Sequence, residues 1–191
     1  MNKHKIEIHT ERLILRNIDI NDLNQLMKCV NNIKIAEMMN GSILVPYTKV
    51  IAVNWINKHQ LDSINSQCIS WAIAKKEDNQ LMGSIQLRLN TVPTSAYLSY
   101  WLGENHWGKG YMYEAGQKVI SFAFEKMQID MILAECLKRN IASRKVLLKL
   151  GFIHQDDVLR IEKFFKREEV FEQYHLNNLT NTLLFKYESS V

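Results

Sequence analysis

The segment at residues 97–125 constrains the fold of this chain more than any other. Residues 97–102, Tyr-Leu-Ser-Tyr-Trp-Leu, alternate with the period of a β-strand, and from Tyr113 the apolar residues follow a helical period. The connection carries three of the chain's seven glycines: Gly103, Gly108 and Gly110. A strand, a glycine loop and a helix in this order leave unpaired backbone N–H groups at the helix N-terminus, where a phosphate is stabilised.

Spacing within the loop excludes two familiar phosphate motifs. A nucleoside-triphosphate P-loop needs Ser or Thr after its Gly-Lys pair, whereas Gly110 follows Lys109 here. A dinucleotide-binding loop needs a third glycine at the position that Tyr113 occupies. Glycines let the backbone approach an anion closely, and Lys109 adds a positive charge. Taken alone, the loop leaves open a tight strand-to-helix turn without a ligand.

A second constrained segment spans residues 138–152. Asn140 is suited to cap the N-terminus of a helix there, and Gly151 is suited to end it. The helix and its approach contain five basic residues and no acidic one: Lys138, Arg139, Arg144, Lys145 and Lys149. This composition fits either an anionic ligand or a solvated basic face.

Together the two segments resemble the GNAT superfamily of acetyl-CoA-dependent N-acyltransferases, most closely its Rim-type branch, the ribosomal-protein N-terminal acetyltransferase-like group. Four stretches carry the resemblance, in the family's order: Thr-Glu-Arg-Leu-Ile-Leu-Arg at 10–16, Tyr-Trp-Leu at 100–102, Trp-Gly-Lys-Gly-Tyr-Met-Tyr-Glu-Ala at 107–115, and Asn140-x-x-Ser143 leading to Gly151-Phe152. The loop departs from the wider superfamily, which often has Gln or Arg where Trp107 stands and Gly or Ala where Met112 stands. The Rim-type branch tolerates both.

The resemblance implies an α/β fold with a mixed, mostly antiparallel sheet of about seven strands flanked by about four helices. We expect one domain over residues 1–191, with a core of about 8–176 and a C-terminal extension, 177–191, of unassigned structure. Alternation and capping signals predict strands near 8–16, 69–74, 84–89, 97–102 and 132–136, two more within 158–176, and helices near 19–31, 48–61, 113–125 and 140–150. In the family, the first two helices and their connection help wall the acceptor pocket.

By resemblance, the chain moves the acetyl group of acetyl-CoA directly to a primary amine. The residues implied in coenzyme binding are Trp101, Leu102, Trp107, Gly108, Lys109, Gly110, Tyr111, Met112, Asn140, Ser143 and Lys145. Lys138, Arg139 and Arg144 are, with Lys145, candidates for the outer phosphate. Ser143 corresponds to the serine proposed to protonate the departing sulfur.

Two carboxylates are candidates for the general base. Glu162 matches a glutamate that some Rim-type members are thought to use through water, and Glu104 lies at the end of the central strand. Either one fits an ordinary surface carboxylate equally well. Glu114, at a helix start, is interpreted as a dipole partner and an i,i+4 mate of Lys118.

The acceptor is less constrained than the donor. An α-amine with a pKa of roughly 8 costs about 1.4 kcal/mol to deprotonate at pH 7, whereas a lysine-like amine near 10.4 costs about 4.6 kcal/mol. A protein or peptide N-terminus is therefore the favoured acceptor. The alternatives are a small-molecule amine (polyamine, amino acid or aminoglycoside) and a non-catalytic acyl-CoA-binding regulatory protein on the same scaffold.

Composition also limits which kind of protein this is and which partners it has. The hydrophobic fraction of 47% and charged fraction of 23% are those of a globular domain, and the net charge of +4 does not demand nucleic acid. No N-terminal apolar run and three scattered cysteines predict a cytoplasmic protein with reduced thiols and no membrane partner. The six histidines show no metal-ligand spacing, so no metal is expected. A homodimer is left open.

Overall fold

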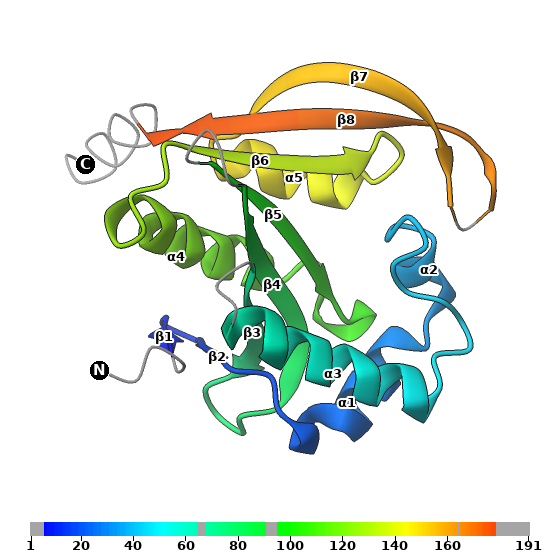
Figure 1. Cartoon of the computed structure of the whole chain (residues 1–191), viewed down its shortest axis with the longest axis vertical. Helices are drawn as coiled ribbons and strands as arrows, with labels where there is room; N and C mark the ends of the chain where they lie inside the picture. The colour runs from blue at the N-terminus through cyan, green and yellow to red at the C-terminus, as the bar shows by residue number, and fades with distance from the viewer. Residues whose placement is uncertain (1–5, 65–67, 91–94, 164, 179–191) are drawn as a thin grey trace.

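The computed structural model describes residues 6–64, 68–90, 95–163 and 165–178. These residues form one eight-stranded sheet with the order β1-β2-β3-β4-β5-β6-β8-β7 (Figure 1). The strands are β1 Ile8–His9, β2 Leu13–Arg16, β3 Cys68–Lys75, β4 Leu81–Leu89, β5 Ser95–Leu102, β6 Met131–Leu137, β7 Ile153–Glu162 and β8 Arg167–Asn177. Every neighbouring pair is antiparallel except β5 with β6, which confirms the predicted mixed sheet.

Five α-helices flank this sheet in the described residues: α1 Leu23–Val30, α2 Ile33–Ala36, α3 Lys49–Ile64, α4 Tyr111–Glu125 and α5 Ile141–Lys149. Four were predicted close to these bounds. The fifth, α2, was missed because a four-residue helix is too short to show a helical period. The helix α4 begins at Tyr111, two residues before the predicted start, because Gly110 and not Met112 is its N-cap.

Each face of the sheet has its own hydrophobic core. One core packs sheet residues against α4, among them Trp71, Ile73, Ile85, Leu87, Ala115, Val119 and Ile120. The other packs the opposite face against α1, α2 and α3, among them Leu26, Val30, Ile35, Ala52, Ile56, Ala72 and Trp101. Neighbours such as Trp71 and Ala72 enter different cores because successive strand side chains point to opposite faces. Helices therefore cover the sheet on both faces (Figure 1).

The sheet divides between β5 and β6. The two strands pair in parallel only from Ser95 to Tyr97, opposite Met131 to Leu133. Beyond Tyr97, β5 stays paired with β4 as far as Leu102, while β6 follows β8. Within the described part of the chain, the division leaves one backbone edge of β5 without a neighbouring strand beyond Tyr97.

The last two strands form a long hairpin that arches over β6 (Figure 1). Their existence within 158–176 was predicted, but β7 begins earlier, at Ile153. Its first five residues are all exposed, so no alternation of period two marks its start. The predicted charged interruption at 163–169 is shorter than expected, because β8 already begins at Arg167. The extension is described only to residue 178, so 179–191 lie outside the described residues.

No helix among the described residues is both long and apolar enough to cross a bilayer.

Candidate active site

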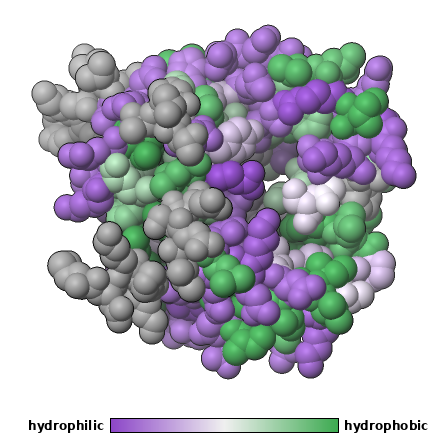
Figure 2. Space-filling view, in the orientation of Figure 1, coloured by the Kyte–Doolittle hydropathy of each residue, from purple (hydrophilic) through white to green (hydrophobic). Residues whose placement is uncertain are grey.

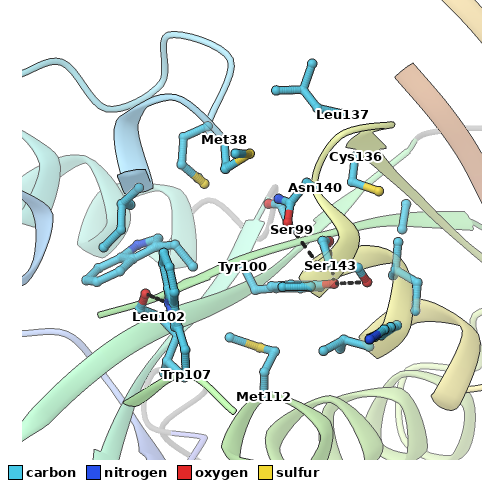
Figure 3. A pocket seen from close by; sticks show the side chains of 18 of the residues that line it. Met38, Ser99, Tyr100, Leu102, Trp107, Met112, Cys136, Leu137, Asn140 and Ser143 are labelled. Atoms are coloured by element: carbon cyan, nitrogen blue, oxygen red, sulfur yellow. Dashed lines mark hydrogen bonds between the residues drawn. The ribbon is translucent and has the colours of Figure 1, made fainter. Parts of the chain in front are cut away.

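A cavity of about 930 Å³ opens where β5 and β6 separate. This volume is typical of sites that enclose a small molecule. Its walls come from both strands, the glycine loop, the start of α5 and the segment from α2 to Ser42. Figure 2 shows the surface hollowed between the α2 segment and β6, and Figure 3 shows the side chains that face the hollow. All predicted coenzyme-binding residues line the cavity except Lys109.

The free edge of β5 presents backbone polar groups to this cavity. Gly103 N donates to Met82 O at 2.8 Å and Asn90 N donates to Ser95 O at 2.9 Å, in a register without a bulge. Antiparallel ladders alternate, so the odd-numbered residues of β5 bond to β4. The backbone N–H groups of Tyr100 and Leu102 therefore point to the edge that β6 has left.

The glycine loop meets the same cavity at the N-terminus of α4. Gly108 and Gly110 have φ values of +71° and +78°, which glycine adopts at little cost. The first hydrogen bond of the helix runs from Glu114 N to Gly110 O, at 3.0 Å. The N–H groups of Tyr111 and Met112 precede it and have no intrahelical acceptor. These two residues line the cavity, where their N–H groups are suited to bind an anion.

Two side chains of the loop are used within the protein. The indole Nε1 of Trp107 donates to Leu102 O at 2.6 Å, which anchors the loop to the end of β5 (Figure 3). The ammonium of Lys109 donates to Asn105 O at 2.9 Å, and Lys109 does not line the cavity. In this loop, the backbone N–H groups are therefore better placed than the Lys109 ammonium to bind an anion in the cavity.

Arg12 braces the loop from outside. Its Nη1 donates to Lys109 O at 3.0 Å, and its guanidinium lies 4.5 Å from the centre of the Tyr111 ring. Arg12 Nε also donates to Glu114 Oε2 at 2.7 Å. The predicted pairing of Glu114 with Lys118 is therefore wrong, because the carboxylate turns toward Arg12 and Thr10.

Ser143 faces the cavity from the first turn of α5. Its backbone N donates to the side-chain oxygen of Asn140 at 3.1 Å, so the predicted cap is confirmed. Its hydroxyl lies 2.8 Å from the hydroxyl of Tyr100, which comes from β5 on the other side of the division (Figure 3). Burial raises the pKa of Tyr100 above its ordinary value, while the bond with Ser143 acts the other way. Burial likewise raises the pKa of Cys136 to about 11, opposed by a hydrogen bond with Ser143.

The basic residues around α5 have different partners. Lys138 pairs with Asp157 at 2.8 Å, Arg139 with Glu169 at 3.0 Å and Arg144 with Glu172 at 2.8 Å. Lys145 lines the cavity and has no acidic partner among the described residues. Of the four phosphate candidates, Lys145 is the one whose charge is available to a ligand, because the others are neutralised by carboxylates.

Neither predicted base lines the cavity. The carboxylate of Glu104 accepts from Lys34 and from Asn32, and these bonds, the one from Lys34 first, lower its pKa. Glu162 has no exposed surface, and its Oε2 accepts from Phe165 N at 2.7 Å in the turn between β7 and β8. A carboxylate with a lowered pKa binds a proton weakly, so Glu104 is poorly suited to act as a base.

The segment after α2 forms the far wall of the cavity. Met38 and its neighbours as far as Ser42 line it, opposite Leu137 and Phe171. Arg139 joins three elements at this wall: its Nε bonds Glu169 at 3.0 Å, and its Nη2 bonds the carbonyl of Glu37 at 2.9 Å. The expectation that α1 and α3 wall the pocket is corrected for this cavity, since among the described residues the connection between them lines it and the two helices do not.

One cluster of side chains could hold a metal ion by distance alone. Ligand atoms of His154, Asp157 and Glu172 lie within 4.8 Å of one another. Lys138 and Arg144 already bond two of these groups, and their positive charges oppose a cation.

Sequence reasoning missed several cavity residues that the tertiary structure brings in: Met38, Cys136 and Phe171. Cys136 lies on a predicted strand, as does Tyr100, which belongs to one of the four stretches that carry the family resemblance. Their facing partners are absent because β5 and β6 separate, and no local pattern records that division.

The chain is similar in sequence to known acetyltransferases. A family model described as "Acetyltransferase (GNAT) domain" matches residues 12–153. An uncharacterized N-acetyltransferase, p20 of Bacillus licheniformis, is 31% identical over 147 residues, which are 76% of this chain and 81% of that relative.

Solved structures with the same fold include two complexes with coenzyme. A ribosomal L7/L12 alpha-N-protein acetyltransferase, RimL, with coenzyme A has a TM-score of 0.81 at 17% identity, covering 90% of this chain and 98% of that one. The microcin C7 self immunity acetyltransferase MccE, with acetyl-CoA and AMP, has a TM-score of 0.77 at 21% identity, covering 87% and 93%.

Proposed function

This chain belongs to the GNAT family of acetyltransferases, and from that premise we propose that it acetylates the N-terminal α-amine of a protein or peptide, by direct transfer from acetyl-CoA. The N-acetyltransferase activity itself follows from the family match and from relatives that bear that name. The observation that supports direct transfer from acetyl-CoA is that the free edge of β5 and the N-terminus of α4 open into one cavity.

The coenzyme would lie along the edge that β6 leaves. Its pantetheine amides would pair with the backbone of Tyr100 as an added strand pairs with a sheet edge. Its diphosphate would accept hydrogen bonds from the N–H groups of Tyr111 and Met112, with Gly108 and Gly110 allowing close approach. Lys145, whose charge has no acidic partner among the described residues, is suited to the outer phosphate.

The acetyl group would then lie near the end of β5. The Leu102 N–H points to this edge and would donate to the thioester carbonyl, which stabilises the oxyanion of the tetrahedral intermediate. Ser143, across the cavity, is suited to give a proton to the departing sulfur. The amine nitrogen bonds the carbonyl carbon, the carbon–sulfur bond breaks, and the nitrogen loses one proton as the sulfur gains one.

The position of the two predicted bases favours an acceptor of low basicity, although Glu37 and Glu135 do line the cavity. Among the described residues, neither Glu104 nor Glu162 lines the cavity, and bonds from Lys34 and Asn32 hold the pKa of Glu104 low. An α-amine with a pKa of roughly 8 needs little help to lose its proton at pH 7, whereas a lysine-like amine needs about 3 kcal/mol more. The methionine side chain of Met38 in the far wall of the cavity favours an apolar residue beside that amine.

A small-molecule amine is the second candidate acceptor. The observation in its favour is that Arg139 bonds both Glu169 and the Glu37 carbonyl, which closes the cavity at its far wall. MccE, whose structure contains acetyl-CoA and AMP, has the same fold.

The test combines coenzyme binding with release of free thiol. Calorimetry with coenzyme A measures binding, and a thiol assay with acetyl-CoA measures transfer to a peptide with a free α-amine. The matched control is the same peptide, one internal lysine included, with its α-amine acetylated beforehand. We expect thiol release with the first peptide and none with the second.

Other outcomes separate the alternatives. Faster release with a polyamine, an aminoglycoside or an amino acid than with any peptide would replace the proposed acceptor. Coenzyme binding without release from any amine would indicate the non-catalytic regulatory protein.

A further inference from the structure

The hydroxyls of Tyr100 and Ser143 form a bridge across the division in the sheet. The two oxygens are 2.8 Å apart, and they join β5 to the first turn of α5 (Figure 3). Ser143 is already held by its backbone, which bonds Asn140 at 3.1 Å. The cap at Asn140 already holds the start of α5, so the contact with Tyr100 serves mainly to orient the Ser143 hydroxyl.

The chemistry of the pair favours Tyr100 as the donor. A phenol O–H is more acidic than the aliphatic O–H of serine, so it is the better hydrogen-bond donor, and burial keeps Tyr100 in its neutral, donating form. The Tyr100 hydroxyl has two acceptors, Ser143 Oγ at 2.8 Å and Ser143 O at 3.4 Å, and the shorter contact is the stronger bond. When Tyr100 donates to Ser143 Oγ, the single proton of Ser143 is left to point elsewhere.

Two sulfur atoms compete for that proton. Cys136 is 8% exposed, lines the cavity from β6 and shares a hydrogen bond with Ser143. In the proposed reaction, the second sulfur is that of the departing coenzyme. Charge that develops on this sulfur would draw the Ser143 proton away from a neutral thiol.

We propose that Tyr100 is a positioning residue that aims the Ser143 proton at the leaving sulfur. The inference rests on the proposed function and deepens it. As the carbon–sulfur bond breaks, Ser143 Oγ passes its proton to sulfur, while Tyr100 keeps its own proton and holds Ser143 Oγ through the 2.8 Å hydrogen bond. That bond stabilises the negative charge that develops on Ser143 Oγ. The proton that the amine loses returns to Ser143 through cavity water, so protons balance over one turnover.

Kinetics of Tyr100→Phe test the role, because phenylalanine keeps the ring and loses the hydroxyl. We expect kcat to fall on the order of tenfold or more, with the Kd for coenzyme A changed less than about threefold. Ser143→Ala should lower kcat at least as far, and the double variant should be no slower than Ser143→Ala alone, because the two groups act as one unit. Additive losses, or an unchanged kcat in Tyr100→Phe, would overturn the proposal.

Tyr47→Phe is the matched control. Tyr47 is buried in the other core, outside the cavity, so it reports what a lost phenol does to stability without touching the site. We expect its kcat to match that of the wild type.

A crystal structure with coenzyme A supplies a readout that does not depend on activity. We expect the coenzyme sulfur within hydrogen-bond reach of Ser143 Oγ, with the Tyr100 contact retained. A sulfur far from Ser143 would overturn the inference even in an active enzyme. If the complex has the expected contacts but no amine releases thiol, the proposed function fails and the positioning geometry stands.

Discussion

Arg12 and Glu114 form an ion pair that ties the start of the sheet to the helix behind the glycine loop. Arg12 Nη2 lies 2.7 Å from Glu114 Oε2, and the Arg12 backbone N donates to Glu114 Oε1 at 2.8 Å. The same guanidinium bonds Lys109 O and lies 3.4 Å from where a Cβ on Gly110 would be. The pair therefore supports the backbone whose N–H groups are proposed to hold a diphosphate.

Removal of this brace should weaken coenzyme binding. In Arg12→Ala the loop loses its contacts to Lys109 and Glu114, and we expect the Kd for coenzyme A to rise on the order of 3–10-fold, or about 1 kcal/mol. Titration calorimetry measures this Kd. Arg16→Ala is the matched control, because Arg16 makes a similar pair with Asp22 away from the cavity. Equal loss of affinity in both variants would count against the bracing role.

The same pair should respond to acid. Burial tends to raise the pKa of Glu114, but bonds from Thr10 and Arg12 outweigh it, so the pKa lies below its ordinary 4.5. A depressed carboxyl stabilises the fold above its unfolded pKa, and that stability is lost as pH falls through the folded value. Urea unfolding measures the free energy of unfolding of the wild type and of Glu114→Gln. The difference between the two should therefore be constant above about pH 5 and shrink below that pH. A constant difference down to pH 3 would contradict this.

Gly110 should not tolerate a β-branched residue. Its φ of +78° is strained for valine by about 1–3 kcal/mol, and the added atoms cover the proposed anion site. We expect Gly110→Val to abolish measurable coenzyme binding. Gly151→Val is the matched control, since Gly151 has a φ of +88° and lies outside the cavity. It should lose stability and keep its affinity, and equal affinities in the two variants would remove the loop assignment.

Arg139 should affect the acceptor and not the coenzyme. Its planar guanidinium bonds Glu169 and the Glu37 carbonyl together, which a lysine ammonium cannot reproduce. For Arg139→Lys we expect the KM for the acceptor to rise on the order of 3–10-fold. The Kd for coenzyme A should stay unchanged. The matched control is Arg167→Lys, because Arg167 also bonds Glu169 but lies outside the cavity. A larger effect on coenzyme than on acceptor would disprove the assignment.

His59 should make the fold sensitive to mild acid. Burial lowers its pKa to about 4, and its Nδ1 lies 2.8 Å from Ser70 Oγ. In the unfolded chain the same group titrates near its ordinary 6.5. Below that pH the unfolded state takes up a proton that the folded state refuses, so stability falls between about pH 6.5 and 4, by at most about 3 kcal/mol.

Denaturant unfolding of His59→Gln at several pH values checks this. The variant should start less stable at pH 7.5, because it loses its ring contact with Trp55. Its stability should then fall less steeply toward pH 4 than that of the wild type. Parallel curves would show that another group carries the acid response.

Much of the fold could be predicted from the sequence, because the patterns that mark its helices and strands involve residues close together in the chain. Alternation predicted β3 and β5, and the capping asparagine predicted the start of α5. The signals failed where an element is too short or too exposed to carry a period. The helix α2 has four residues, and β7 is an edge strand whose first five residues are all exposed. A period of two appears in the sequence only where the residues of one face differ in size or polarity from those of the other.

Local sequence patterns were enough to predict the glycine loop, the helix that follows it and the cap at Asn140, because these depend on backbone conformation and on groups a few residues apart. The contact between Tyr100 and Ser143, the pairing of Glu114 with Arg12 instead of Lys118, and the position of the two candidate bases outside the cavity became visible only in the folded chain. Those outcomes depend on where β5 and β6 part and on how distant segments are brought together. That arrangement arises from packing of the whole sheet, and no short stretch of residues encodes it.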